Sequence, residues 1–196
     1  MTKIKNFRIT LRAREMARWL KRERGLETTP ELDLTLEQFI KDSRRWIEPA
    51  AVYTTLTRPI AEKTTTIPFS ENTVAVSLIA VSIGPAAEKE RLSVPEGDVR
   101  ESFLAALQQE ALSQTLQFAA RLLQDQAKEE ECELSAPVPA QDAATVASLA
   151  SLVGIQRIGI DLAASAPELP AHAFMAWFFW TPVGKAASRR PEKAVA

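Results

Sequence analysis

Histidine occurs once in this sequence of 196 residues, as His172. An imidazole of ordinary pKa can act as a general acid or base near neutral pH. His172 follows Pro170 and stands between two alanines in an apolar segment. We interpret it as a structural, hydrogen-bonded histidine, with acid–base chemistry as the alternative. With one histidine and one cysteine, a metal centre would have to rest on carboxylates, and we expect none.

The single cysteine, Cys132, excludes an internal disulfide and a cysteine-rich metal site. Its neighbours include Glu130, Glu131 and Glu133, and negative charge beside a thiol raises its pKa and suppresses the thiolate. We therefore expect no nucleophilic role for Cys132. The six glycines form neither a GxGxxG nor a Walker arrangement. A hydrolase or a nucleotide-dependent enzyme is accordingly the least favoured class.

Two further groups of side chains could take part in chemistry. Glu110 is the only carboxylate within a polar cluster that includes Gln108 and Gln114. A buried Glu there would need a partner, and we expect a solvent-facing side chain. The aromatic residues at 177–180 could stack on a flat ligand, but aromatic residues in strands usually pack in the core, which is our prediction.

The segment that must organise these residues is an apolar run, VAVSLIAVSIGP, at residues 74–85. Its Val and Ile content and the closing Gly-Pro predict a central strand covered on both faces. Period-two alternation after Ala51 predicts a half-exposed strand. We predict two more strands at 157–162 and 171–180, the second apolar on both faces.

Four segments have helical spacing, and polar capping residues mark their starts. The predicted helices run from Thr10 to Arg24, from Thr35 to Pro49, from Asp98 to about Lys128, and from Asp142 to Leu152. The proline-containing segment 132–141 should be largely irregular. We expect one domain over residues 1–182 and a disordered basic tail over residues 183–196.

Charge and hydropathy bear on location and partners. The longest apolar stretch, 171–180, is too short to cross a membrane as a helix, and the basic start leads into no apolar signal segment, so we expect a cytoplasmic protein. Residues 1–24 hold nine Lys and Arg against two Glu, yet no phosphate-binding motif accompanies them, and we do not expect nucleic acid binding. An apolar edge strand at 171–180 could pair across a homo-oligomer.

The order of these elements resembles the reactivation domain of cobalamin-dependent methionine synthase and its free-standing relatives. The similar features are a basic first helix, a helix end followed by Pro and a Val-Tyr strand, an apolar strand ending in Gly-Pro, a long helix and a closing pair of strands. The stretches are ARWLKRERG at 17–25, WIEPAAVYTTL at 46–56, VAVSLIAVSIGP at 74–85, the helix at 99–128 and ELPAHAFMAWFFW at 168–180. The resemblance spans most of residues 8–180.

The resemblance implies an α+β fold, a single domain in which helices flank a twisted antiparallel sheet. It also implies a role in the reductive reactivation of oxidised cobalamin, in which the domain binds S-adenosylmethionine and meets a reduced flavodoxin. The family's ligand loop, an Arg followed by Pro-Gly-Tyr, falls at ELSAPVPAQD, residues 133–142. Here Glu133 takes the place of the Arg, so a methionyl carboxylate would meet a negative charge instead of a guanidinium fork.

On this resemblance the ligand pocket lies between that loop and the closing strands. Its candidate ligand-binding residues are Glu133, Ser135, Pro137, Asp142 and His172. The first hypothesis is a divergent, free-standing member that assists corrinoid-dependent methyl transfer or corrinoid reactivation. It would bind a corrinoid protein, its reductase or S-adenosylmethionine, with S-adenosylmethionine or cobalamin as the cofactor. The alternative is a non-enzymatic interaction or scaffold protein that kept the fold and lost the ligand site.

Overall fold

The computed structural model describes residues 1–95, 97–162 and 168–184, so most of the predicted tail over residues 183–196 lies outside it. Its strands are all antiparallel and form one six-stranded sheet. They are β1 (Thr2–Lys5), β2 (Ala50–Thr57), β3 (Ala75–Ser82), β4 (Cys132–Leu134), β5 (Val138–Pro139) and β6 (Ala173–Pro182). The order is β1-β2-β3-β6-β4, and β5 also pairs with β6.

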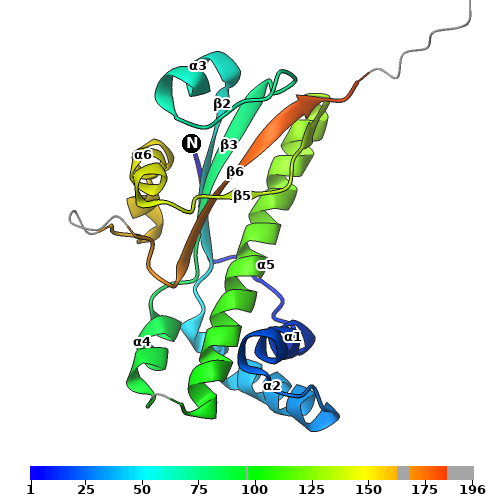
Figure 1. The fold of residues 1–196 in the computed structure, drawn as a ribbon, viewed down its shortest axis with the longest axis vertical. Coiled ribbons are helices and arrows are strands. Elements are labelled where there is room, and N and C mark those ends of the chain that lie inside the picture. Colours follow the sequence, from blue (N-terminus) through cyan, green and yellow to red (C-terminus); the bar gives the residue numbers. More distant parts are fainter. Residues whose placement is uncertain (96, 163–167, 185–196) are drawn as a thin grey trace, which may run out of the picture.

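Helices cover both faces of this sheet and one of its ends (Figure 1). They are α1 (Ala13–Arg24), α2 (Pro30–Ser43), α3 (Arg58–Thr64), α4 (Ala86–Ser93), α5 (Val99–Glu129) and α6 (Ala143–Val153), with two 3₁₀ turns, η1 (Arg44–Trp46) and η2 (Ile155–Ile158). The α+β fold implied by the resemblance is therefore the fold of this chain. None of the described helices has both the length and the apolar character needed to cross a membrane.

Strand β3 lies in the middle of the sheet, between β2 and β6. Its side chains alternate between two apolar layers. Val76 and Leu78 pack on the α6 face, whereas Ile79 and Val81 pack on the α5 face. All of them are buried, which confirms the prediction of a central strand covered on both faces. A strand with both faces covered is the arrangement for which a continuous β-branched run is suited.

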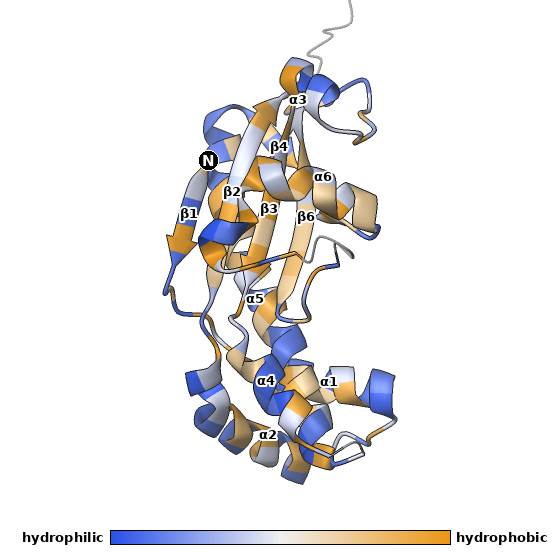
Figure 2. Cartoon of the chain, turned by 90° about the vertical axis from the view of Figure 1, so that its left-hand side faces the viewer, coloured by the Kyte–Doolittle hydropathy of each residue, from blue (hydrophilic) through white to orange (hydrophobic). Residues whose placement is uncertain are grey.

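The helices α1, α2 and α4 gather around the first turns of α5, below the sheet (Figure 1). The predicted stripe of α1, which includes Met16, Ala17 and Leu20, is fully buried there. Gly25 ends α1 at a φ of 67°, and its N–H donates to the Lys21 carbonyl. Figure 2 shows hydrophilic residues along α1, α2 and α4 and hydrophobic ones along the central strands.

Several predicted elements need correction. Helix α2 begins at Pro30, because the Thr29 hydroxyl caps it by accepting from the Leu32 N–H at 3.2 Å. Thr35, predicted as the cap, lies inside that helix and donates to the Glu31 carbonyl. Segment 132–141 is not wholly irregular, since β4 and β5 pair with β6. That pairing also makes β6 an interior strand, so the edge-strand argument for a homo-oligomer is wrong.

The strand predicted at 157–162 is also wrong, because the 3₁₀ turn η2 occupies residues Ile155–Ile158. Gly154 and Gly159, with φ of 68° and 76°, bracket this turn and permit backbone conformations that other residues seldom adopt. Ile158 and Ile160 are buried and Gly159 is exposed. Buried and exposed residues therefore alternate as they would in a strand, although the backbone does not form one. The turn itself packs on the same face of the sheet as α6.

Candidate functional site

Four of the five predicted site residues lie in the segment at residues 133–142, and this segment pairs with β6 through β4 and β5. Glu133 is exposed and stands opposite Thr181 in the sheet register. Ser135 is bound to β6 twice, since its N–H donates to the Phe179 carbonyl at 2.9 Å and its hydroxyl oxygen accepts from the Phe179 N–H at 3.0 Å. The same hydroxyl donates to the Ala136 carbonyl. Ser135 therefore attaches this segment to the sheet.

Pro137 and Asp142 lie farther along the same segment. Pro137 is exposed. Asp142 is the N-cap of α6, and its carboxylate accepts from the Thr145 N–H at 2.8 Å. Hydrogen bonds from Thr145 hold the pKa of Asp142 below its ordinary value of 3.8. Asp142 also lines a small cleft of about 250 Å³ that includes Glu168.

His172 stands at the opposite end of β6. Its Nδ1 lies 2.5 Å from the Glu88 carboxylate of α4, and the His172 carbonyl accepts from the Ile83 N–H. The expected hydrogen bond of this histidine is therefore present. His172 precedes Thr181 by nine residues, a distance of roughly 30 Å along a strand. The structure brings Glu133 and Ser135 to one end of β6 and places His172 at the other.

A cleft of about 350 Å³ opens beside Glu133. Lys128, near the end of α5, lines this cleft with Gln124 and Cys132. The Lys128 ammonium lies 3.8 Å from the Asp125 carboxylate, but both side chains are well exposed, and such pairs hold their groups weakly. The cleft by Glu133 therefore presents one ammonium and one carboxylate to solvent.

Cys132 is buried beside this cleft. Burial raises the pKa of its thiol, and the charges of Glu130 and Glu131 raise it further. The predicted suppression of the thiolate is confirmed, with burial as the larger cause.

Glu110 is a functional candidate that the sequence prediction placed wrongly, because its side chain is only 5% exposed. It accepts a hydrogen bond from Arg12 Nε at 2.9 Å. Burial raises the pKa of Glu110 above its ordinary value of 4.5, and the Arg12 hydrogen bond partly offsets that effect. Glu110 and Arg12 line a cleft of about 360 Å³ between α1 and α5. The helical spacing from Phe103 and Leu107 was a signal for this burial, since both lie on the inner stripe of α5.

The aromatic residues of β6 pack in the core, as predicted. Trp177, Phe178 and Trp180 are buried. The Trp180 Nε1–H donates to the Ser77 hydroxyl at 2.8 Å, and that hydroxyl also bonds the Thr55 hydroxyl at 2.7 Å. The Trp180 ring is therefore held in place by a hydrogen bond to the sheet. Within the part of the chain that the structure describes, no group of three or more His, Cys, Asp or Glu side chains could hold a metal ion.

Comparison with known proteins separates fold from sequence. No protein-family model matches this chain, and no curated protein matches its sequence. Among solved structures, the crystal structure of the MetH reactivation domain bound to AdoHcy is similar to it, with a TM-score of 0.57. That match covers 94% of this chain and 79% of the other chain at 13% sequence identity. The resemblance to reactivation domains is thus present in the fold.

Proposed function

We propose that this protein assists corrinoid-dependent methyl transfer as a free-standing relative of the reactivation domain that binds S-adenosylmethionine or S-adenosylhomocysteine. The fold supports this proposal, because the similar structure spans nearly the whole chain and was solved with AdoHcy bound. The observation that carries the proposal is the cleft in which Lys128 and Glu133 stand together. It lies where the sequence resemblance puts the start of the ligand loop.

The charges of this cleft match the amino-acid end of such a ligand. A methionyl or homocysteinyl group carries one ammonium and one carboxylate. In the proposed site the Lys128 ammonium binds the carboxylate, and the Glu133 carboxylate binds the ammonium. With Glu in place of Arg, position 133 then binds the ammonium of the ligand instead of its carboxylate. The volume of about 350 Å³ lies at the lower end of the range for small-molecule sites, roughly 300–1,000 Å³.

In this role the cobalt chemistry belongs to a corrinoid protein. The chain contributes a site for the methyl donor and a surface on which the corrinoid protein or its reductase docks. The basic residues of α1 are one candidate surface for an acidic partner, since Arg14 and Arg18 are exposed on it.

Calorimetric titration with S-adenosylhomocysteine tests the ligand site, with cobalamin and a buffer blank run in parallel. We expect saturable binding that Lys128→Gln and Glu133→Gln each weaken by about tenfold or more, as for loss of a charge-assisted hydrogen bond. The matched control is Lys89→Gln, an exposed lysine of α4 outside the cleft. Absence of heat from S-adenosylhomocysteine, or equal weakening in the control, would contradict the site.

A second candidate function is that of a non-enzymatic interaction or scaffold protein. The observation that favours it concerns Ser135. Its hydroxyl already accepts from the Phe179 N–H and donates to the Ala136 carbonyl, so it is not available to a ligand. If neither S-adenosylhomocysteine nor cobalamin gives heat, the immobilised chain should be tested with a purified corrinoid protein and with its reductase. Retention of either protein would support docking without a small ligand. Failure of both would reject the corrinoid role.

A further inference from the structure

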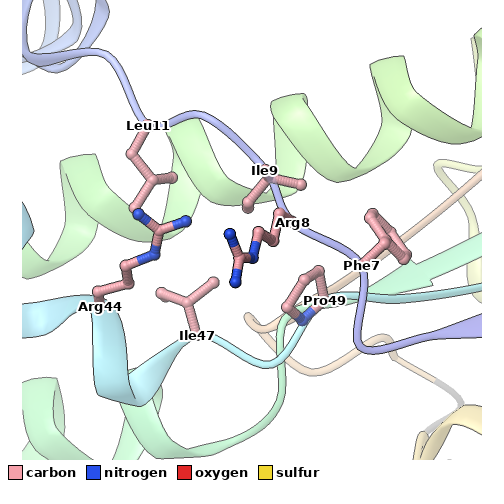
Figure 3. A pocket seen from close by; sticks show the side chains of 7 residues that line it. All are labelled: Phe7, Arg8, Ile9, Leu11, Arg44, Ile47 and Pro49. Atoms are coloured by element: carbon pink, nitrogen blue, oxygen red, sulfur yellow. The ribbon is translucent and has the colours of Figure 1, made fainter.

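A cleft of about 440 Å³ lies between two chain segments that connect the sheet to the helices below it (Figure 3). One segment leads from β1 to α1, and the other leads from η1 to β2. The lining residues are Phe7, Arg8, Ile9, Leu11, Arg44, Ile47 and Pro49. This cleft is separate from the Lys128 and Glu133 cleft, and its chemistry is independent of the corrinoid role.

The cleft holds two arginines and no acidic residue. Arg8 and Arg44 are exposed, and neither forms an ion pair or side-chain hydrogen bond with a described residue. Figure 3 shows both guanidinium groups extending over Ile47 toward one another. Of the carboxylates near Arg44 in the sequence, that of Asp42 accepts from Gln38 Nε2 and that of Glu48 lies beside Gly84. Like charges that face each other repel, so the arrangement favours an anion between them.

The floor of the cleft is apolar, and its walls are held in place. Ile9 and Pro49 are buried, and Ile47 is half-buried. The Phe7 ring stacks on Phe118 of α5 with centroids 4.1 Å apart. Two backbone hydrogen bonds fix the walls, one from the Asn6 N–H to the Pro49 carbonyl at 3.2 Å and one from the Glu48 N–H to the Ile83 carbonyl at 2.8 Å. The backbone of the cleft is therefore preformed, whereas the exposed Arg8 and Arg44 side chains become ordered only when the ligand binds.

We propose that this cleft binds a small organic phosphomonoester. A phosphomonoester carries about two negative charges at neutral pH, which matches two guanidinium groups. The planar fork of each guanidinium can donate two parallel hydrogen bonds to phosphate oxygens. The organic part of the ligand then contacts the half-buried apolar side chains of Leu11 and Ile47, which line the cleft. One wall belongs to the connection between β1 and α1, and the other belongs to η1 and its connection to β2. A phosphate bound by Arg8 and Arg44 therefore links these two segments.

Calorimetric titration of the full chain with phenyl phosphate tests this site. We expect saturable binding that Arg8→Gln and Arg44→Gln each weaken by about tenfold or more. Arg45→Gln is the matched control, because Arg45 adjoins Arg44 in sequence, lies outside the lining and stacks on the Trp46 ring at 5.2 Å. All three variants remove one positive charge from an exposed side chain, and their melting temperatures show whether each is folded.

Titrations with three further compounds separate the contribution of the phosphate group from that of the organic group. Inorganic phosphate should bind more weakly than phenyl phosphate, and benzyl alcohol should give no saturable heat, because the anchor is the charge and the floor adds to it. Succinate should bind less tightly than phenyl phosphate. The proposal is overturned if phenyl phosphate gives no saturable heat, if Arg45→Gln weakens binding as much as Arg44→Gln, or if succinate binds more tightly. Titration of Arg44→Gln with S-adenosylhomocysteine should be unchanged, which separates this site from the other cleft.

Discussion

Two regions of this molecule differ in whether their buried polar side chains have hydrogen-bond partners. One is the six-stranded sheet, the sheet end, and the other is the helical end, where α1, α2 and α4 pack around the first turns of α5. In the sheet, the fully buried Ser77 bonds both Thr55 and Trp180. Among the described residues, six buried side-chain atoms have no hydrogen-bond partner, and only Trp177 Nε1 belongs to the sheet. The other five lie on α2, α4 and α5 or next to η1. They are Asp33 Oδ1, Ser43 Oγ, Arg91 Nε, Gln108 Nε2 and Gln114 Nε2.

The helices of the helical end are also joined by ion pairs. Glu101 accepts from Arg24 at 3.1 Å and from Arg91 at 2.9 Å, and these pairs join α5 to α1 and α4. Both pairs remain partly open to solvent, and ion pairs that water reaches contribute little stability each. The difference indicates that the apolar sheet determines the fold, whereas the helical end keeps polar groups that a ligand or partner could engage. Variants at both ends test that division.

The largest effect should come from the centre of the sheet. Leu78→Ala removes a fully buried side chain from β3, and we expect a loss of about 2–5 kcal/mol in the free energy of unfolding. Leu92→Ala on α4 is the control, since that leucine is 72% exposed and should change stability by less than about 0.5 kcal/mol. Urea denaturation measures both. Equal losses would break the assignment of the core to the sheet.

The next effect should come from the hydrogen bonds inside the sheet. Ser77→Ala leaves the Trp180 Nε1–H without its acceptor in a buried position. We expect a loss of about 1–3 kcal/mol, the cost of one unsatisfied buried donor. Ser151→Ala, at an exposed serine of α6, serves as the control in the same denaturation experiment. A loss no larger than that of the control would mean that water reaches Trp180.

The elements that could be predicted from the sequence are those with one uninterrupted pattern. The Val and Ile run of β3 and the apolar stripe of α1 were placed correctly, because periodicity records burial directly. For Glu110 the helical spacing from Phe103 and Leu107 indicated burial, but its partner, Arg12, is 98 residues away, and no local pattern pairs two such positions. The turn η2 was missed because burial on a sheet face can alternate without β geometry.

The candidate sites were harder still to predict. Arg8 and Arg44 belong to two connecting segments, and only the tertiary fold sets them over one floor. Lys128 lies on a helix and Glu133 on a strand, and the turn after α5 brings them to one cleft. The resemblance supplied a segment for the ligand loop. It could not supply the cation, because the family's Arg position is Glu133 in this chain.

A smaller effect, visible mainly as pH dependence, is expected at the helical end. Burial raises the pKa of Glu110 above 4.5, so the folded state binds this proton more tightly than the unfolded state does. As pH rises from 4.5 through the folded pKa, the unfolded state therefore holds fewer protons, and stability falls. Glu110→Gln should remove this fall and shift stability at neutral pH by no more than about 1 kcal/mol, since Arg12 is 44% exposed.

Denaturation midpoints measured from about pH 4 to pH 8 test this prediction. Glu62→Gln is the control, because Glu62 is an exposed partner of Arg58 on α3. The ratio of variant to wild-type stability should increase with pH for Glu110→Gln and stay flat for Glu62→Gln. A decrease with pH would mean that the ionised carboxylate stabilises the fold, and the helical end would then resemble the sheet in satisfying its buried polar groups.

The smallest effect should come from Asp142, which caps α6 beside the sheet. Its carboxylate is exposed but accepts a hydrogen bond from the Thr145 N–H. Asn and Asp cap helices equally well, so Asp142→Asn should leave stability at neutral pH nearly unchanged. The Thr145 hydrogen bonds hold the pKa of Asp142 below 3.8, so its contribution is present above pH 3.8 and is lost as pH falls through the folded pKa. The variant should lack that acid-dependent loss, whereas Asp161→Asn, at an exposed position that caps no helix, should keep it. Thermal melts in the acid range distinguish the two variants, and an unchanged acid dependence in Asp142→Asn would show that the cap of α6 does not depend on the charge.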